Sequence, residues 1–169
     1  PCPPYVREAT AHFYRRHKHY LLTSGTTGYS PNPSEVAIGD SWHGPFTVLG
    51  NPHPDDPSHT SFHSQISSVF KVPGKKDLYI ACADRLLPQK MDDNYEEYAR
   101  LYELIFTDRN VEEEEEFSRL ATQFSGPEAG TSIADYVWLP LRFAEPDEMH
   151  PNGMVYIDGK DEWRIEDYE

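Results

Sequence analysis

The stretch YVREATAHFYRRHKHYLLTSGTTGYSPN, residues 5–32, decides how the rest of the chain is interpreted. Two runs of apolar and aromatic residues, 11–15 and 19–24, are separated by charged and polar residues that suit a tight turn. The glycines and prolines of the following loop, residues 24–32, do not allow the second strand to continue. We therefore predict a β-hairpin with the carboxylate of Glu8 just before its first strand. Glu8 and the loop flank the two strands, so a ligand that contacts one can contact the other.

The rest of the chain repeats this pattern of short strands and turns. Aromatic residues make up 13% of the sequence, which suits short strands better than long buried helices, and the 15 prolines indicate many turns. We predict six further strands within residues 34–40, 41–50, 64–72, 77–84, 135–143 and 152–159. The expected fold class is all-β.

The strands form two sets that resemble a weak internal repeat. Glu8 lies five residues before Phe13, and Gln65 lies five residues before Phe70, which gives a period of about 57 residues. Each set would be a four-stranded antiparallel meander, the unit from which the blades of a β-propeller are built. We predict one blade at 1–50 and a second at 60–166, with Glu8 and Gln65 in equivalent places facing the propeller axis. A plain antiparallel sandwich without an axis is the alternative.

The segment 92–131 does not fit the strand pattern. It carries twelve acidic residues and three arginines, and so contributes most of the net charge of −14. Tyr95, Tyr98, Tyr102 and Ile105 recur at helical spacing, and residues 111–124 can form a second helix. We interpret the segment as a helical insertion at a blade edge. Its run of five glutamates is expected to be a solvated face, because adjacent helical glutamates point in different directions and form no calcium cage.

Composition excludes several classes of partner. A net charge of −14 argues against nucleic acid, whose phosphates require a basic surface. No apolar run approaches the length of a membrane span, and no signal-like segment is recognised at the start. The length of 169 residues suits one domain with a real core. Cys2 and Cys82 could pair with each other, although free buried thiols are the favoured interpretation.

The residues taken alone indicate little chemistry. Glu8 is compatible with a surface role or with an ion pair to Arg7, and Gln65 is compatible with an ordinary polar residue at a strand start. No two of the eight histidines have a convincing metal spacing with an acidic partner, so no metal or other cofactor is expected. The set Ser24, Ser64 and His63 makes no believable triad, because no orienting acid is placed nearby.

Several segments together resemble a known family of enzymes. The matching segments are TSGTTG (23–28), FHSQ (62–65), PGKKD (73–77) and YVWLPLRF (136–143), which occur in this order. They are similar to those of glycoside hydrolase family 43, in particular its exo-β-1,3-galactanases (galactan 1,3-β-galactosidases). The resemblance covers about three quarters of the chain and leaves out the insertion and the tail.

The resemblance implies a five-bladed β-propeller and an inverting glycosidase that acts on galactan or a related polysaccharide outside the cell. Glu8 matches the general acid, which protonates the leaving oxygen. Gln65 matches a glutamine in the position where the attacking water is held, a role that rests on the resemblance because an amide is a poor base. Thr26 and Gly28 match loop positions that contact the sugar, and Tyr29 replaces a tryptophan that can stack on a sugar face.

The sequence also departs from the family pattern. Thr10 replaces a proline, residues 133–135 replace Asp-Ser-Arg, and the acidic insertion is foreign to it. Two blades are recognised where five are needed, so the N-terminal blades that complete the sugar pocket are the expected partner of this segment. A non-catalytic carbohydrate-binding or interaction module is the alternative function.

Overall fold

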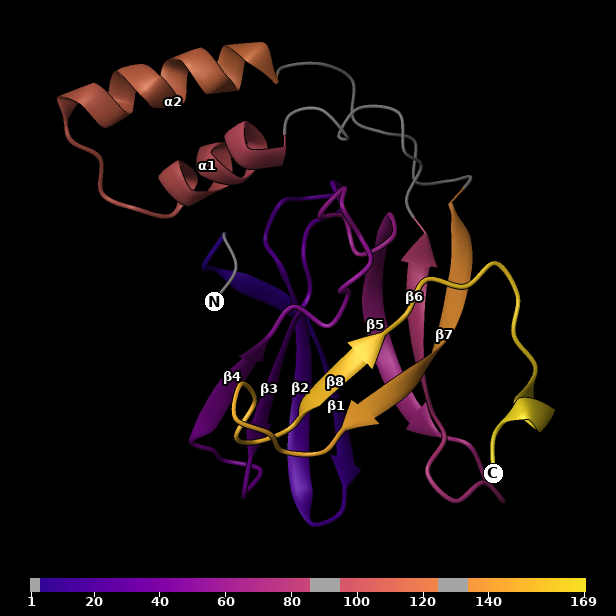
Figure 1. Ribbon diagram of the computed structural model, residues 1–169. Coiled ribbons are helices and arrows are strands. Elements are labelled where there is room, and N and C mark those ends of the chain that lie inside the picture. Colours follow the sequence, from indigo (N-terminus) through magenta and orange to yellow (C-terminus); the bar gives the residue numbers. More distant parts are fainter. Residues whose placement is uncertain (1–3, 86–94, 125–133) are drawn as a thin grey trace.

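The computed structural model describes residues 4–85, 95–124 and 134–169. This part of the chain is mostly β-structure with one helical hairpin (Figure 1). The elements in chain order are β1 (Arg7–Arg15), β2 (Lys18–Gly25), β3 (Glu35–Gly39), β4 (Phe46–Gly50), β5 (Ser64–Lys71), β6 (Tyr79–Arg85), α1 (Tyr95–Ile105), α2 (Val111–Gln123), β7 (Asp135–Ala144), β8 (Met154–Ile157) and a short 3₁₀ helix, η2 (Ile165–Asp167).

The strands form two four-stranded sheets, in the orders β1-β2-β3-β4 and β5-β6-β7-β8. All strand pairs are antiparallel and join neighbours in the sequence, so each sheet is a meander. The eight expected strands are confirmed, and one sheet falls within each expected blade. The domain limits of 1–50 and 60–166 stay a prediction, because the strands alone do not define them.

The first hairpin shows how its sequence sets the register. Arg15 pairs with Lys18, so the turn consists of Arg16 and His17 alone, and both have positive φ values of 48° and 64°. A two-residue turn with positive φ matches the right-handed twist of the two strands. The expected turn was one residue too long, because Lys18 already belongs to β2.

The two sheets pack face to face over one apolar core. Phe13 stacks on Tyr20 within the first sheet, with ring centroids 4.8 Å apart, and contacts Tyr79 and Phe143 of the second sheet. The alternation of β1 and β2 places these aromatic residues on the inner face, where burial of apolar area stabilises the pair of sheets. Fully buried aliphatic side chains complete the core: Leu22, Val36, Val155 and Ile157.

An ion pair joins the sheets at the end of the core. Arg15 is 8% exposed and binds Asp77 through two nitrogens, while its guanidinium lies 3.8 Å above the ring of Phe143. The hydrogen bond from Arg15 holds the pKa of Asp77 below its ordinary value, against the opposing effect of burial. The buried arginine therefore has both a charge partner and an aromatic face to pack on.

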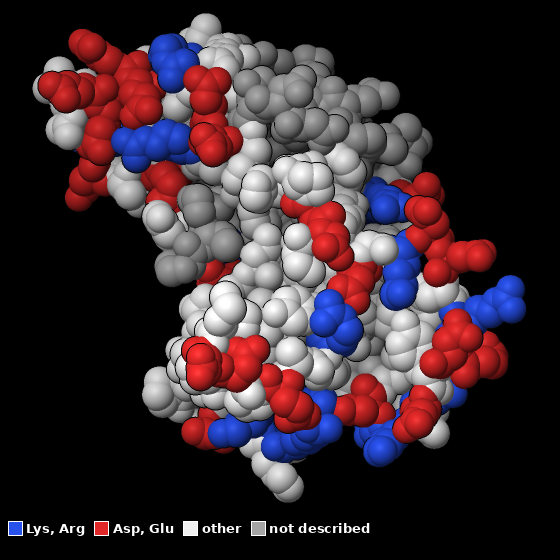
Figure 2. Space-filling view, viewed as in Figure 1, with Lys and Arg blue, Asp and Glu red and all other residues white. Residues whose placement is uncertain are grey.

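Helices α1 and α2 form the expected insertion between β6 and β7 (Figure 1). They pack through Leu101, Leu104 and Leu120, which are buried. Acidic side chains gather over both helices, with a few basic ones among them (Figure 2). Within the described residues, α1 and α2 fall short of the length and apolar character that a membrane-spanning helix needs.

The glutamate run 112–116 is more structured than a plain solvated face. Glu113 forms a capping box with Asn110 at the start of α2. Arg100 of α1 contacts both Glu113 and Glu116, at 3.4 and 3.0 Å. Part of the acidic run therefore ties the two helices together, and the sequence did not reveal these pairs because they depend on how the helices cross.

The two cysteines differ in what the structure shows of them. Cys82 is a half-buried free thiol on β6. Burial raises its thiol pKa, against a smaller effect of its hydrogen bond with Ser68. Cys2 lies outside the described residues, so the expectation of a free thiol is tested at Cys82 alone.

Candidate functional site

Glu8 lies near the beginning of β1, opposite Ser24 of β2. The strand register shifts between Glu8 and Ala11, and Ala9 in this bulge has a positive φ of 50°. A bulge re-aims the side chains on its strand, and strand bulges are common beside functional sites. The carboxylate is half-buried at this edge of the first sheet.

Gln65, near the beginning of β5 in the second sheet, reaches across to Glu8. Its side-chain nitrogen Nε2 lies 2.7 Å from Ser24 Oγ and 3.4 Å from Glu8 Oε1. The two residues that the sequence singled out for catalysis thus come into contact, although 57 positions separate them. Their contact is a fact of the structure, whereas their catalytic roles stay a prediction.

Ser24 is the residue that the sequence did not assign to this site. Its side chain is 3% exposed, and its hydroxyl accepts the shorter hydrogen bond from Gln65. The amide nitrogen of Gln65 is thus engaged by Ser24 and Glu8, and its amide oxygen is the group that can accept a further hydrogen bond. The predicted hairpin offered one signal for Ser24. The end of its second strand, at Ser24, pairs with the start of its first strand, at Glu8.

The loop after β2 is held by a buried asparagine. Asn32 is 3% exposed, accepts a hydrogen bond from Gly25 N at 2.7 Å, and donates to Gly25 O and Thr27 Oγ1 at 2.8 and 2.7 Å. The amide thus uses three of its hydrogen-bonding positions to close the loop on itself. The sequence indicated a loop here but not the residue that fixes its shape.

The expected sugar-contacting residues lie on this fixed loop. The backbone nitrogen of Thr26 donates to Val6 O at 3.0 Å, which ties the loop to the segment before β1. Gly28 has a φ of +60°, a conformation that glycine adopts at low cost. Tyr29 is 58% exposed, so its ring is available to a ligand. No contact in the structure tests whether these residues bind sugar.

A second loop, residues 51–63, leads into Gln65 and is organised by Asp56. This carboxylate accepts hydrogen bonds from the backbone nitrogens of Ser58, Thr60 and Phe62, at 3.2, 2.9 and 3.1 Å. Burial acts to raise the pKa of Asp56, but the hydrogen bonds from Ser58, Phe62 and Thr60 outweigh it and leave that pKa below its ordinary value.

The two loops are joined by buried hydroxyl groups. Ser61 Oγ donates to Asn32 O at 2.8 Å and accepts from the backbone nitrogen of Ser34 at the same distance. Ser61 is 1% exposed, so these bonds form without competition from water. The segments that position Ser24 and Gln65 therefore form one connected network.

His53 lies in the same loop and is nearly inaccessible to water. Its side chain is 3% exposed, its ring meets that of Phe62 edge to face at 5.2 Å, and its Nδ1 atom finds no hydrogen-bond partner among the residues that the structure describes. Burial lowers the pKa of His53 to about 4, although the charge of Asp56 acts in the opposite direction. The imidazole is therefore neutral at physiological pH.

The described residues do not assemble other familiar catalytic groups. Ser64 Oγ donates to Ser61 O at 2.6 Å, and Ser24 is engaged by Gln65, so these two hydroxyls serve the loop network. Among the residues that the structure describes, no cluster of three or more His, Cys, Asp or Glu side chains could hold a metal ion.

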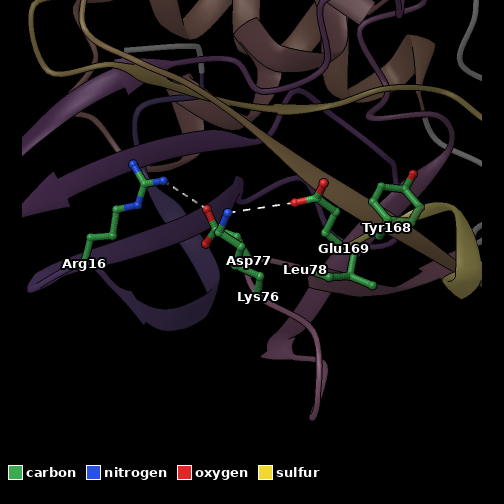
Figure 3. A pocket seen from close by; sticks show the side chains of 6 residues that line it. All are labelled: Arg16, Lys76, Asp77, Leu78, Tyr168 and Glu169. Carbon is green, nitrogen blue, oxygen red and sulfur yellow. Dashed lines mark hydrogen bonds and ion pairs between the residues drawn. The ribbon is translucent and has the colours of Figure 1, made fainter.

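A surface hollow lies at the other end of the strands (Figure 3). It has a volume of about 270 Å³ and lies where the β1–β2 and β5–β6 turns meet the C-terminal residues. Its charged groups are paired, Arg16 with Asp77 and Lys76 with Glu169. Arg16, in the turn after β1, is eight residues beyond Glu8, which is roughly 25 Å by the rise of a strand. This hollow is therefore separate from the site at Glu8 and Gln65.

The fold places the chain among proteins built from paired antiparallel β-meanders. It is a pair of four-stranded meanders whose strand ends bring a glutamate and a glutamine together at one edge. Known protein structures share this fold, whereas no family sequence model and no curated protein sequence matches the chain.

The solved structures that match include glycoside hydrolases of family 43 and exo-β-1,3-galactanases. A family 43 β-1,3-galactosidase solved with galactodeoxynojirimycin superposes with a TM-score of 0.59 at 22% identity, over 94% of this chain and 32% of its own. A second β-1,3-galactosidase of the family gives a TM-score of 0.59 at 22% identity, over 96% of this chain and 24% of its own. An exo-β-1,3-galactanase from Clostridium thermocellum gives 0.53 at 20% identity, over 89% and 23%.

The chain thus has the fold of one part of the family 43 β-1,3-galactosidases and exo-β-1,3-galactanases, as the motifs in its sequence indicated. It spans about a third or less of the length of these solved chains. At this level of identity the match defines the fold, and activity, substrate and partners are matters of proposal.

Proposed function

We propose that this chain is part of a glycoside hydrolase that releases sugar from a β-1,3-galactan or a related polysaccharide. The observation that carries the proposal is the contact between Glu8 and Gln65, which come from different sheets and lie 3.4 Å apart. The contact brings together the two residues that match the acid and the glutamine of family 43, although they lie on different sheets. An extracellular location is part of the proposal, because polysaccharides of this kind occur outside the cell.

In the proposed reaction Glu8 protonates the leaving glycosidic oxygen and the amide oxygen of Gln65 holds the attacking water. Inverting glycosidases separate the two groups by about 6.5–9.5 Å, so that the sugar and the water fit between them. The observed 3.4 Å is shorter than this. A productive complex therefore requires the Gln65 or Glu8 side chain to rotate away, and catalytic contacts of this kind are often not formed until substrate binds.

The loop after β2 supplies the proposed sugar contacts. Thr26 and Gly28 offer polar backbone groups at the site edge, and the exposed ring of Tyr29 offers a flat surface for the apolar face of a pyranose. The amide of Asn32 keeps this loop in one shape without a ligand, which reduces the entropy that binding must offset.

We further propose that the two sheets are successive blades of a propeller. Phe13 and Phe70 occupy equivalent places in the repeat, yet Phe13 faces the other sheet whereas Phe70 is 41% exposed and faces away from it. In a propeller, equivalent side chains all point in the same rotational direction. In a two-sheet sandwich, both would point inward. Relative to the interface between the two sheets, Phe13 points inward and Phe70 points outward, so both point in the same rotational direction, which favours the propeller.

The outer face of the second sheet exposes aromatic side chains. Beside Phe70, the outer face of the second sheet exposes Trp138 and Tyr136, which are 55% and 77% exposed. Further blades would cover such a face, and the longer chains of the matched structures have the length to supply them. We propose that the remaining blades complete the sugar pocket.

A non-catalytic carbohydrate-binding or interaction module is the second candidate. The direct hydrogen bond between Gln65 and Glu8 favours it, because that bond closes the space in which a water would have to sit. In this case the site binds sugar on the Thr26–Tyr29 loop without turnover.

The deciding measurement is the release of galactose from β-1,3-galactan by the chain alone and by a version combined with the missing blades. Activity in the combined form only, lost in Glu8→Gln while sugar still binds, is the expected result. Sugar binding without turnover in both forms would favour the binding module. Neither binding nor turnover in the combined form would contradict both candidates.

A further inference from the structure

Helix α1 carries a row of tyrosines that the proposed function does not use. Tyr95, Tyr98 and Tyr102 are spaced by three and four residues, so they lie along one face of the helix. An adjacent face of α1 packs on α2 through Leu101 and Leu104, which are buried, and Tyr98 at the border of the two faces also meets Phe124 at the end of α2, with ring centroids 4.9 Å apart. The tyrosine face is therefore turned toward the rest of the molecule.

Two of these tyrosines meet the loop on which the sugar contacts are proposed. Ser30 Oγ donates a hydrogen bond to the Tyr98 hydroxyl at 2.7 Å. The Tyr102 hydroxyl lies so close to Gly28 that a Cβ atom there would come within 2.9 Å of it. Tyr29 therefore lies between two loop residues, Gly28 and Ser30, that each meet a tyrosine of α1.

The same helix also contacts the other two segments that lead to the site. The ring of Tyr95 stacks on that of His59, in the loop that precedes Gln65, with centroids 5.9 Å apart. The backbone nitrogen of Tyr5, just before β1, donates to the side chain of Glu103. One helix thus touches every segment from which Glu8, Ser24 and Gln65 project, and in Figure 1 α1 lies over this end of the strands.

We propose that α1 is a wall of the sugar site, and that Tyr98 and Tyr102 are positioning residues that hold Gly28 and Tyr29 ready for a galactoside. The inference rests on the proposed function for its ligand and gives the acidic insertion a role there. An insertion that served only as a separate surface would not need to place three tyrosines on two loops of one site.

The physical effect follows from preorganisation. A ligand that stacks on Tyr29 needs the loop in one conformation, and each contact with α1 removes alternatives before binding. Loss of one net hydrogen bond between neutral groups weakens the favoured conformation by a factor of about 2 to 10. We therefore expect Tyr98→Phe to raise the Kd for the sugar about threefold to tenfold, through the loop and without a direct contact.

The test uses the 169-residue chain labelled with ¹⁵N and titrated with β-1,3-galactobiose. The backbone amide signals of Gly28 and Tyr29 report binding and loop conformation together. Tyr98→Phe is compared with Tyr102→Phe, and Tyr136→Phe serves as a matched control because Tyr136 is 77% exposed on β7. We expect a higher Kd and shifted loop signals in the first two variants and neither change in the control.

The outcomes separate this inference from the proposed function. If the sugar binds and neither Tyr98→Phe nor Tyr102→Phe changes its Kd, the role of α1 is wrong and the proposed function stands. If the wild type shows no saturable binding, the sugar ligand is wrong for this chain. The positioning role is then supported by faster hydrogen exchange at Gly28 and Tyr29 in Tyr98→Phe, and overturned by unchanged exchange.

Discussion

Acid should destabilise this protein through one buried histidine. His53 has a pKa of about 4 in the folded chain, against an ordinary value of 6.5. Between these two values the unfolded chain binds a proton that the folded chain does not, so stability falls as the pH drops through this window. Above pH 6.5 and below pH 4 this residue adds no further pH dependence.

The magnitude follows from the size of the shift. Each pKa unit corresponds to about 1.4 kcal/mol, so the loss between pH 7 and pH 4 amounts to about 3 kcal/mol from this residue. For a domain of this size that is a large part of a typical free energy of unfolding. The group is 3% exposed, so solvent screening reduces the figure little.

The assay is urea unfolding followed by tryptophan fluorescence at a series of pH values from 7.5 to 4. His53→Leu removes the titrating group and fills the site with an apolar side chain, and His43→Gln is the matched control because His43 is exposed. We expect the free energy of unfolding of His53→Leu to fall less steeply with acid than that of the wild type, and that of the control to follow the wild type. Parallel curves for all three proteins would refute the reasoning.

Three further substitutions test the framework of the site. Asp56→Ala leaves one buried and two part-buried backbone nitrogens without their acceptor and should cost about 2–4 kcal/mol in urea unfolding, whereas exposed Asp55→Ala should cost under about 0.5. Arg15→Met leaves the Asp77 carboxylate without its main partner and should cost about 2 kcal/mol at neutral pH, less at a pH low enough to protonate Asp77; an unchanged cost would contradict the ion pair. Asn32→Ala opens the loop after β2, and proteolysis should cut there first; a wild-type cleavage pattern would show that the amide is not needed.

Much of the fold could be predicted because its determinants are local. The alternation through Ala11, Phe13 and Arg15 marks a strand with one buried face, and the glycines and prolines after Ser24 mark its partner's end. The helical spacing of Tyr95, Tyr98 and Tyr102 likewise depends only on neighbours in the sequence. Such patterns do not depend on distant parts of the chain, so each element could be placed within a few residues.

The candidate site was predicted only in part. Glu8 and Gln65 were singled out through the resemblance and the repeat, and they do meet. Ser24, Asn32 and Asp56 were not assigned, because a serine, an asparagine or an aspartate in a loop is ordinary in sequence. Whether such a residue holds a site together depends on the residues that it contacts in the folded chain.

The sequence by itself determined the order and type of the elements, the separation of charge into the insertion, and the residues that resemble an exo-β-1,3-galactanase. Only the tertiary structure decided that Gln65 bonds Ser24 as well as Glu8, that α1 returns to the loop at Gly28, and that Phe13 and Phe70 face in opposite ways. The physical reason is the range of the interactions. Strand alternation and helical spacing are set within a few residues, whereas a hydrogen bond between two sheets depends on packing that the whole chain must complete.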